Sequence, residues 1–177
     1  MANPFNKWVD QNKHIIEEKI KTVSFQATIE RNTKVEEKKI FDGKFVVGED
    51  KQFRFEMGHR TVVSDGEIWQ SYDDRTDQIF IQEPDKKLEK ALFSWVKVKK
   101  LKLLPIKNKS DGSYKIKLFG KNNDVHAYFN METNVLDSIL ISQWDGLESK
   151  IFNISLVVAD SMILTIGTES STLFDLR

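Results

Sequence analysis

Alternation of apolar and polar residues is the feature that most restricts the fold of this chain. Between Val23 and Glu30 every second residue is apolar, and a period of two is typical of a strand with one buried face. Segments of the same kind recur at short intervals and predict further strands. These are Val35–Val47, Gln52–Met57, Arg60–Ser64, Ile68–Tyr72, Gln78–Gln82, Tyr114–Phe119, Val125–Asn130, Leu136–Trp144 and Lys150–Val157.

Turn signals lie between several of these strands. Asp65-Gly66, Asp111-Gly112 and Asp145-Gly146 each place a glycine between two β-patterned segments. Glycine adopts positive φ without a steric penalty, so these pairs favour tight hairpin turns. An antiparallel meander is the simplest topology that uses them.

Two segments have helical periodicity instead. Apolar residues three and four positions apart predict a helix from Pro4 to Ile20, with Asn3 as its N-cap and Pro4 at the first helical position. After Pro84, the segment Asp85–Lys97 again carries its apolar residues on one helical face. We expect this second helix to lie over the mouth of the sheet, and residues 1–177 to form one domain without repeats or linkers.

The composition argues against several classes of function. The 27 basic and 27 acidic residues give no net charge, which argues against a nucleic-acid-binding protein. The absence of cysteine excludes thiol chemistry. His14, His59 and His126 lie in separate predicted elements without the spacing of metal ligands, and the glycines form no phosphate-binding loop. We therefore expect neither a metal nor a cofactor.

The sequence offers no convincing set of catalytic residues either. Ser64 lies near Asp65 and His59 in the sequence, but it stands at a hairpin turn and not in a GxSxG strand-to-helix turn. Adjacent carboxylates such as Asp73 and Asp74 point to opposite faces of a strand, so they cannot act on one substrate atom. We expect that the protein is not an enzyme.

Aromatic residues are the remaining candidates for function. The chain has 12 Phe, 4 Trp and 3 Tyr, and apolar residues alternate along neighbouring predicted strands at Phe41, Phe45, Val47, Phe53, Phe55 and Met57. The sheet is therefore expected to present one apolar face. A filled hydrophobic core is the alternative interpretation of this pattern.

One segment gives the pattern a more specific meaning. The run from Val62 to Asp73, with Ser64-Asp65-Gly66 after an apolar pair and Trp69 to Tyr72 in the next strand, resembles the corresponding hairpin of LolA-type outer-membrane lipoprotein carriers. Val23–Ala27, Phe41–Phe45, Phe53–Phe55, Gln78–Phe80, the Leu88–Trp95 helix and Phe174–Arg177 are similar to that family in the same order.

The resemblance implies an α+β, mainly β fold. It implies a strongly curved antiparallel sheet that forms an unclosed β-barrel, with the N-terminal helix and a mid-chain helical lid over an apolar cavity. Pattern and resemblance together predict the residues that line the cavity and bind lipid. These are Phe45, Val47, Phe53, Phe55, Trp69, Tyr72, Ile79, Leu92, Trp95, Leu140, Phe152 and Ile154.

The function that the resemblance implies is that of a periplasmic chaperone. Such a protein shields the acyl chains of lipoproteins and carries them from the inner to the outer membrane. Its implied partners are acylated lipoproteins, an inner-membrane lipoprotein-releasing ABC transporter and an outer-membrane acceptor, with the carrier acting as a monomer. Met1–Pro4 shows no signal sequence, so a signal peptide is expected to have been removed.

The sequence departs from the family pattern at one place, and three other interpretations of the chain are kept as alternatives. The family usually has a basic residue and a proline after the Phe45–Val47 strand, where this chain reads Gly48–Lys51, so a latch between that residue and the lid is not assumed. A lipid- or lipoprotein-sensing regulatory domain on the same fold is the main alternative. A lipid-handling enzyme that uses Ser64 is a weaker one. The related LolB acceptor usually begins with a lipidated cysteine, which this chain lacks.

Overall fold

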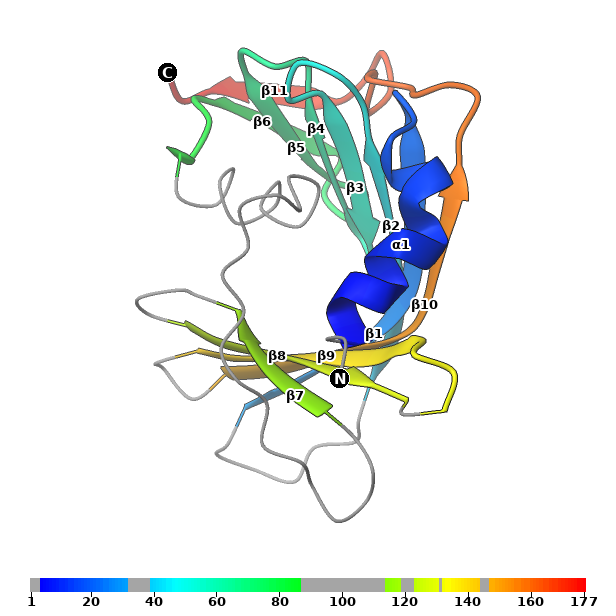
Figure 1. The fold of residues 1–177 in the computed structure, drawn as a ribbon. Coiled ribbons are helices and arrows are strands. Elements are labelled where there is room, and N and C mark those ends of the chain that lie inside the picture. The colour runs from blue at the N-terminus through cyan, green and yellow to red at the C-terminus, as the bar shows by residue number, and fades with distance from the viewer. Residues whose placement is uncertain (1–3, 32–38, 87–113, 119–122, 131, 144–146) are drawn as a thin grey trace.

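The described part of the molecule is a curved sheet of eleven strands with a helix on its concave side (Figure 1). The computed structural model describes residues 4–31, 39–86, 114–118, 123–130, 132–143 and 147–177. The helix α1 spans Pro4–Ile16. The strands are β1 (Lys21–Arg31), β2 (Ile40–Val47), β3 (Phe53–Met57), β4 (Arg60–Ser64), β5 (Trp69–Asp73), β6 (Gln78–Gln82), β7 (Tyr114–Leu118), β8 (Asn123–Phe129), β9 (Leu136–Gln143), β10 (Leu147–Val158) and β11 (Thr172–Asp175).

The strand order contains two meanders instead of one. Strands β1 to β6 follow one another through the sheet, and so do β7 to β10. The two sets are joined because β10 pairs with β1, and β11 adds to β6 in parallel. Within the described residues the terminal strands β7 and β11 do not pair with each other, so the sheet is curved but unclosed, as expected.

Most of the expected strands are present. The predicted hairpins between Gln52 and Gln82 form β3 to β6, each within one residue of the expected limits. The strand expected from Val35 is described from Ile40 onward. Nearly all of the helix expected over Asp85–Lys97, and both Asp111-Gly112 and Asp145-Gly146, fall outside the described residues.

The helix α1 ends four residues earlier than its apolar pattern predicts. The buried ammonium group of Lys21 explains this end, because Nζ donates hydrogen bonds to the carbonyl oxygens of Ile16 and Glu18 at 2.8 and 2.7 Å. The carbonyl of Ile20 is already used by the sheet, where it accepts a hydrogen bond from the Ala159 amide at 3.2 Å. Lys21 therefore caps the helix where the chain turns into β1.

A segment after β10 crosses the side of the sheet opposite α1. We call residues 159–171 the strap; Figure 1 shows it in orange to red, leading from β10 to β11. Arg54 on β3 donates hydrogen bonds to the strap carbonyls of Thr165 and Ile163 at 3.0 and 3.3 Å. The sequence analysis predicted neither the strap nor β11.

Asp77 fastens the end of the strap. Its carboxylate accepts hydrogen bonds from the hydroxyl groups of Ser171 and Tyr72 at 2.5 and 3.1 Å, and its carbonyl accepts one from the Thr172 amide at 2.9 Å. The Ser171 hydrogen bond is the largest of the contacts that hold the pKa of Asp77 below its ordinary value. The strap is thus tied to the β5–β6 hairpin immediately before β11 begins.

Candidate functional site

The concave side of the sheet carries a continuous apolar cluster. In antiparallel strands, directly opposed residues point to the same side, and the pairs Val23 with Phe45, Phe45 with Phe55, and Phe53 with Ser64 therefore place these residues together. We call this side the aromatic face. Its buried members are Phe25, Ala27, Phe45, Val47, Phe53 and Trp69.

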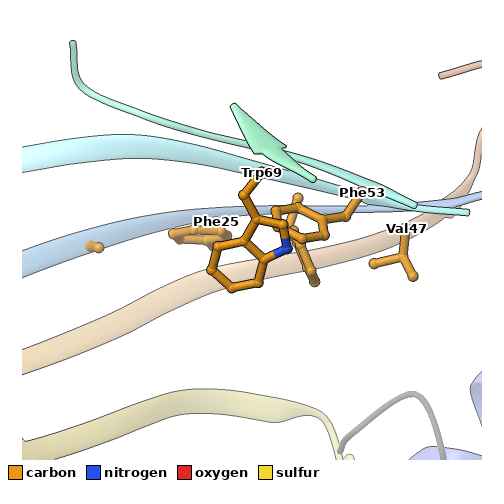
Figure 2. Close-up of a cluster of buried hydrophobic side chains, with 6 residues drawn as sticks. Phe25, Val47, Phe53 and Trp69 are labelled. Carbon is orange, nitrogen blue, oxygen red and sulfur yellow. The ribbon is translucent and has the colours of Figure 1, made fainter. Parts of the chain in front are cut away.

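The aromatic rings form a connected series across four strands, and Figure 2 shows Phe25, Phe53 and Trp69 of this series. Phe25 stacks on Phe55 with ring centroids 6.2 Å apart, and Phe55 meets the edge of Phe45 at 6.1 Å. Phe45 lies 5.7 Å from Phe53, which makes an edge-to-face contact with Trp69 at 5.4 Å. Each such pair contributes about 0.5–1.5 kcal/mol beyond the area it buries, so the series fixes the orientation of its rings.

Gly43 provides the space for the first ring. A Cβ atom at Gly43 would overlap Cε2 and Cζ of Phe25, which faces it from β1. The Phe25 ring therefore lies over the bare backbone of β2 and reaches Phe55 on the next strand. This use of a strand glycine beneath an aromatic ring also pins the register of the two strands.

The aromatic face is only partly covered. Phe55, Met57 and Val62 pack against the buried cluster but keep part of their surface exposed. The helix α1 covers the neighbouring region over β8 to β10, where Phe5 packs against Phe129 with ring centroids 6.2 Å apart. Ile154 packs against both clusters and connects them. A long apolar ligand would therefore meet an apolar surface beside the helix.

Polar groups are few in this cluster. The indole Nε1 atom of Trp69 is buried and has no hydrogen-bond partner within the described ranges, and the side chain as a whole is 3% exposed. Lys21 lies on the same side, opposite Val47, and two of its hydrogen bonds go to the carbonyl groups at the end of α1. Burial lowers the pKa of Lys21, and the nearby charge of Glu18 partly offsets that effect.

The strand register places some of the predicted lining residues on the aromatic face and others on the opposite side of the sheet. Phe45, Val47, Phe53, Phe55, Trp69 and Ile154 belong to the aromatic face or pack against its cluster. Four others, Tyr72, Ile79, Leu140 and Phe152, are paired with residues that point to the other side. Leu92 and Trp95 lie outside the described residues.

Strand periodicity explains two of these positions directly. Trp69 and Tyr72 are three residues apart on β5, so their side chains point to opposite sides. Tyr72 faces Ile79 in the register, and Ile79 contacts the strap, because a Cβ atom on Gly167 would lie 2.6 Å from Ile79 Cδ1. We call this the outer face; its buried members Val46, Val63 and Ile79 lie opposite the aromatic side.

A β-bulge explains why Phe152 and Ile154 point to different sides. Ser24 pairs with Ser155 but Gln26 pairs with Phe152, so β10 contains one extra residue at this position. Asn153 lies in the bulge with φ of 52°. The extra residue breaks the alternation, so Phe152 and Leu140 face outward with Gln26 and Lys150 while Ile154 faces inward.

The sequence analysis also missed residues that belong to the aromatic face. Phe25 and Ala27 are buried in the cluster, and Val23, Val62 and Ile151 pack against it. Met57 also packs against it; the alternation in the sequence places Met57 on the apolar face, although it is not among the predicted lipid-binding residues. The alternation in Val23–Ile29 already indicated that these β1 side chains share one face. The β1–β10 pairing, which brings Ile151 opposite Ala27, has no signal in local sequence.

The polar groups near Ser64 form turns. The Ser64 hydroxyl accepts a hydrogen bond from the Gly66 amide at 3.1 Å, and Gly66 has φ of 106°. The Asp65 carboxylate accepts hydrogen bonds from the Ile68 and Glu67 amides, which lower its pKa. His59 Nδ1 lies 3.0 Å from Asp74 Oδ1. The interpretation of Ser64 and Asp65 as turn residues is confirmed.

Neither a metal site nor a membrane-spanning helix is found among the described residues. In the part of the chain that the structure describes, no three His, Asp or Glu side chains are placed to hold a metal ion. No described helix is long and apolar enough to cross a membrane. At the bend after β2, Glu49 lies 3.4 Å from Lys19, and both side chains are exposed.

Comparison with known proteins gives similarity in structure only. No protein-family model matches the sequence, and no curated protein matches it significantly. An uncharacterized conserved protein from Thermus thermophilus overlaps 98% of this chain and 99% of its own, with a TM-score of 0.55 and 10% identity. At that identity the overlap shows a shared fold and no shared activity.

Two other solved structures overlap to a smaller degree. A LolA superfamily protein from Nitrosomonas europaea has a TM-score of 0.47 and 10% identity, covering 93% of this chain and 99% of that one. A putative outer membrane lipoprotein-sorting protein domain from Vibrio parahaemolyticus has a TM-score of 0.43 and 6% identity, covering 91% and 95%.

Proposed function

We propose that the protein binds the acyl chains of lipoproteins on its aromatic face and carries them through the periplasm to the outer membrane. It acts without a chemical step on its cargo. The observation that supports this most is the partly exposed apolar series on the concave side, where Phe55, Met57 and Val62 lie beside the buried rings. The sequence resemblance to LolA-type carriers and the names of the structural neighbours point to the same class of ligand.

The energetics of acyl-chain transfer suit such a role. Shielding an acyl chain from water is worth about 0.8 kcal/mol per CH₂ group, so a long chain gains on the order of 10 kcal/mol. A carrier must also release its cargo, and any cost of opening the binding face lowers the apparent affinity. The proposed partners are acylated lipoproteins, the transporter that releases them from the inner membrane and an acceptor in the outer membrane.

A pair of charge substitutions tests the binding face. Phe55→Glu places a carboxylate among the aromatic rings, whereas Phe152→Glu makes the same change on the outer face. We expect saturable binding of a fluorescent acyl probe to the unmodified protein and to Phe152→Glu, and at least tenfold weaker binding to Phe55→Glu. Thermal unfolding of each variant checks that it is folded.

The nature of the cargo is tested by competition. A diacylated lipopeptide should displace the probe, and the same peptide without acyl chains should not. Transfer of the lipopeptide to acceptor vesicles supports carriage. A stable complex that binds the lipopeptide but never passes it on supports the sensing alternative, and absence of saturable probe binding contradicts the proposal as a whole.

A further inference from the structure

Trp69 is a hydrogen-bond donor without an acceptor in the middle of an apolar cluster. Its side chain is 3% exposed, and among the residues that the structure describes its Nε1 atom has no partner. Figure 2 shows the indole among Phe25, Phe53 and Val47, with its nitrogen on the side toward Phe53 and Val47. None of these three side chains offers an oxygen or nitrogen atom. The labelled side chains near the donor are therefore all hydrocarbon.

The residues directly across the neighbouring strands do not satisfy the donor either. Trp69 is paired with Ser64 on β4 and with Gln82 on β6. The Ser64 hydroxyl is engaged with the Gly66 amide of the turn. Neither neighbour carries a charge, and the ammonium group of Lys21, which lies on the same face opposite Val47, already donates to the Ile16 and Glu18 carbonyls.

A buried donor without a partner lowers stability, because it loses its hydrogen bonds to water and gains none in return. A phenylalanine at this position would fill the same cluster without that loss. The structure thus holds a donor that becomes satisfied only when an acceptor enters the aromatic face. The same strand face is where we propose that acyl chains bind.

We infer that Trp69 Nε1 donates a hydrogen bond to the neutral carbonyl oxygen of an ester-linked acyl chain. This inference rests on the proposed function and names the polar group of the ligand. A carbonyl is favoured over a free carboxylate because Lys21, the cation placed on this face, already donates hydrogen bonds to the Ile16 and Glu18 carbonyls, and a buried carboxylate without its own counter-charge is costly. Ester-linked chains occur in the diacylglyceryl group of lipoproteins and in phospholipids, and the inference applies to the chemistry that they share.

The test compares ester with ether linkage. Diacyl phosphatidylglycerol and its dialkyl ether analogue have the same chains and headgroup, but the ether lacks the carbonyl oxygen. We expect the ester to displace a fluorescent acyl probe about 2- to 12-fold more effectively than the ether, which is the effect of one neutral hydrogen bond. A diester lipopeptide and its ether analogue form the second pair and show whether lipoprotein, phospholipid or both present the carbonyl.

Tryptophan substitutions show which side chain causes the preference for esters over ethers. Trp69→Phe should bind esters and ethers equally, while the matched substitution Trp8→Phe on α1 should retain the preference. The indole N–H signal of Trp69, identified in NMR spectra as the one lost in Trp69→Phe, should shift downfield with the ester and remain in place with the ether. The spectra of the unmodified protein provide this evidence even if Trp69→Phe does not fold.

The two proposals fail in distinguishable ways. Saturable binding of ester and ether lipids with equal affinity, in both pairs and without a shift of the Trp69 signal, overturns the role of Trp69 and leaves acyl binding intact. Absence of saturable binding for every lipid overturns the proposed function, and the inference with it. A preference for one pair only supports the inference and identifies the source of the carbonyl.

Discussion

The two faces of the β2–β6 region bury similar numbers of apolar side chains but are closed in different ways. On the outer face, Val46, Val63 and Ile79 are buried, and the strap is held there by Arg54 and Asp77. On the aromatic face, the rings pack on one another, and Phe55, Met57 and Val62 remain partly exposed.

Because its two faces are closed in different ways, one sheet can serve two purposes. Hydrogen bonds from side chains to strap carbonyls fix the outer face in one arrangement, because these groups need defined partners. The hydrophobic effect, by contrast, is non-directional, so the partly exposed side chains beside the rings can accept another apolar surface. We therefore expect the strap to fix the outer face, and the aromatic face is where we propose that the ligand binds.

The largest effect is expected from truncating the centre of each face. Phe53→Ala removes a side chain that is 1% exposed and should lower the free energy of unfolding by about 3–5 kcal/mol. Val63→Ala on the outer face, also 1% exposed, removes less volume and should cost about 2 kcal/mol. Urea denaturation measures both, and a larger loss for Val63→Ala would contradict this ranking.

A glycine pair distinguishes rigid from adaptable packing. Gly43→Ala forces a methyl group against the Phe25 ring, and such overpacking costs about 1–3 kcal/mol. Gly48→Ala meets the terminal methyl of Met162 on the strap at 2.6 Å, a flexible group that can move away. Denaturation should show the smaller loss for Gly48→Ala, and acyl-probe binding should weaken only in Gly43→Ala. Equal losses would mean that the Phe25 ring adapts.

Releasing the strap should affect the outer face alone. Gly167 has φ of 75° and approaches Ile79, so Gly167→Ala adds a left-handed penalty of about 1–2 kcal/mol to a close contact. Hydrogen exchange should become faster in β11, and binding of the acyl probe should be unchanged. Ser161→Ala, at an exposed strap position, is the control. Loss of probe binding in Gly167→Ala would show that the two faces are coupled.

The smallest effect is a dependence of strap attachment on pH. The pKa of Asp77 is lowered in the folded protein, so its carboxylate stabilises the fold above its ordinary pKa of 3.8. This stabilisation is lost as the pH falls below that value through the lowered folded pKa. Limited proteolysis of the strap should therefore accelerate in that range. In Asp77→Asn cleavage should be faster at neutral pH and less dependent on pH; an unchanged profile would exclude Asp77 as the attachment.

Local pattern predicted the strands well and their faces incompletely. The hairpins from Gln52 to Gln82 were correct because turn residues and alternation are both local signals. The bulge at Asn153 was not predictable, since an inserted residue leaves no mark on composition but reverses every side chain beyond it. Half of the predicted lining residues lie on the aromatic face or pack against its cluster. Phe152 does not, because of the bulge.

Long-range pairing accounts for the other omissions. The strap and β11 contain few alternating residues, and β11 is a strand only because β6 offers it an edge. The contact of Arg54 with Ile163 and Thr165 joins residues 109 and 111 positions apart. Single-sequence reasoning has no access to such partners. The unpaired Nε1 of Trp69 is likewise a property of its surroundings and not of its residue type.

The position of β11 has a consequence for how the protein is made. Its parallel pairing with β6 involves Thr172 to Asp175, almost at the end of the chain. The pairing of Lys21 with Val158 in the middle of the sheet also needs residues that are synthesised long after β1. During synthesis Val158 and Thr172–Asp175 leave the ribosome after the strands with which they pair, and contacts between distant parts of a sequence form slowly. The β1–β10 pairing and the β6–β11 edge therefore form only after β2 to β9 have been synthesised, and until then the nascent chain exposes strand edges on which a chaperone can act.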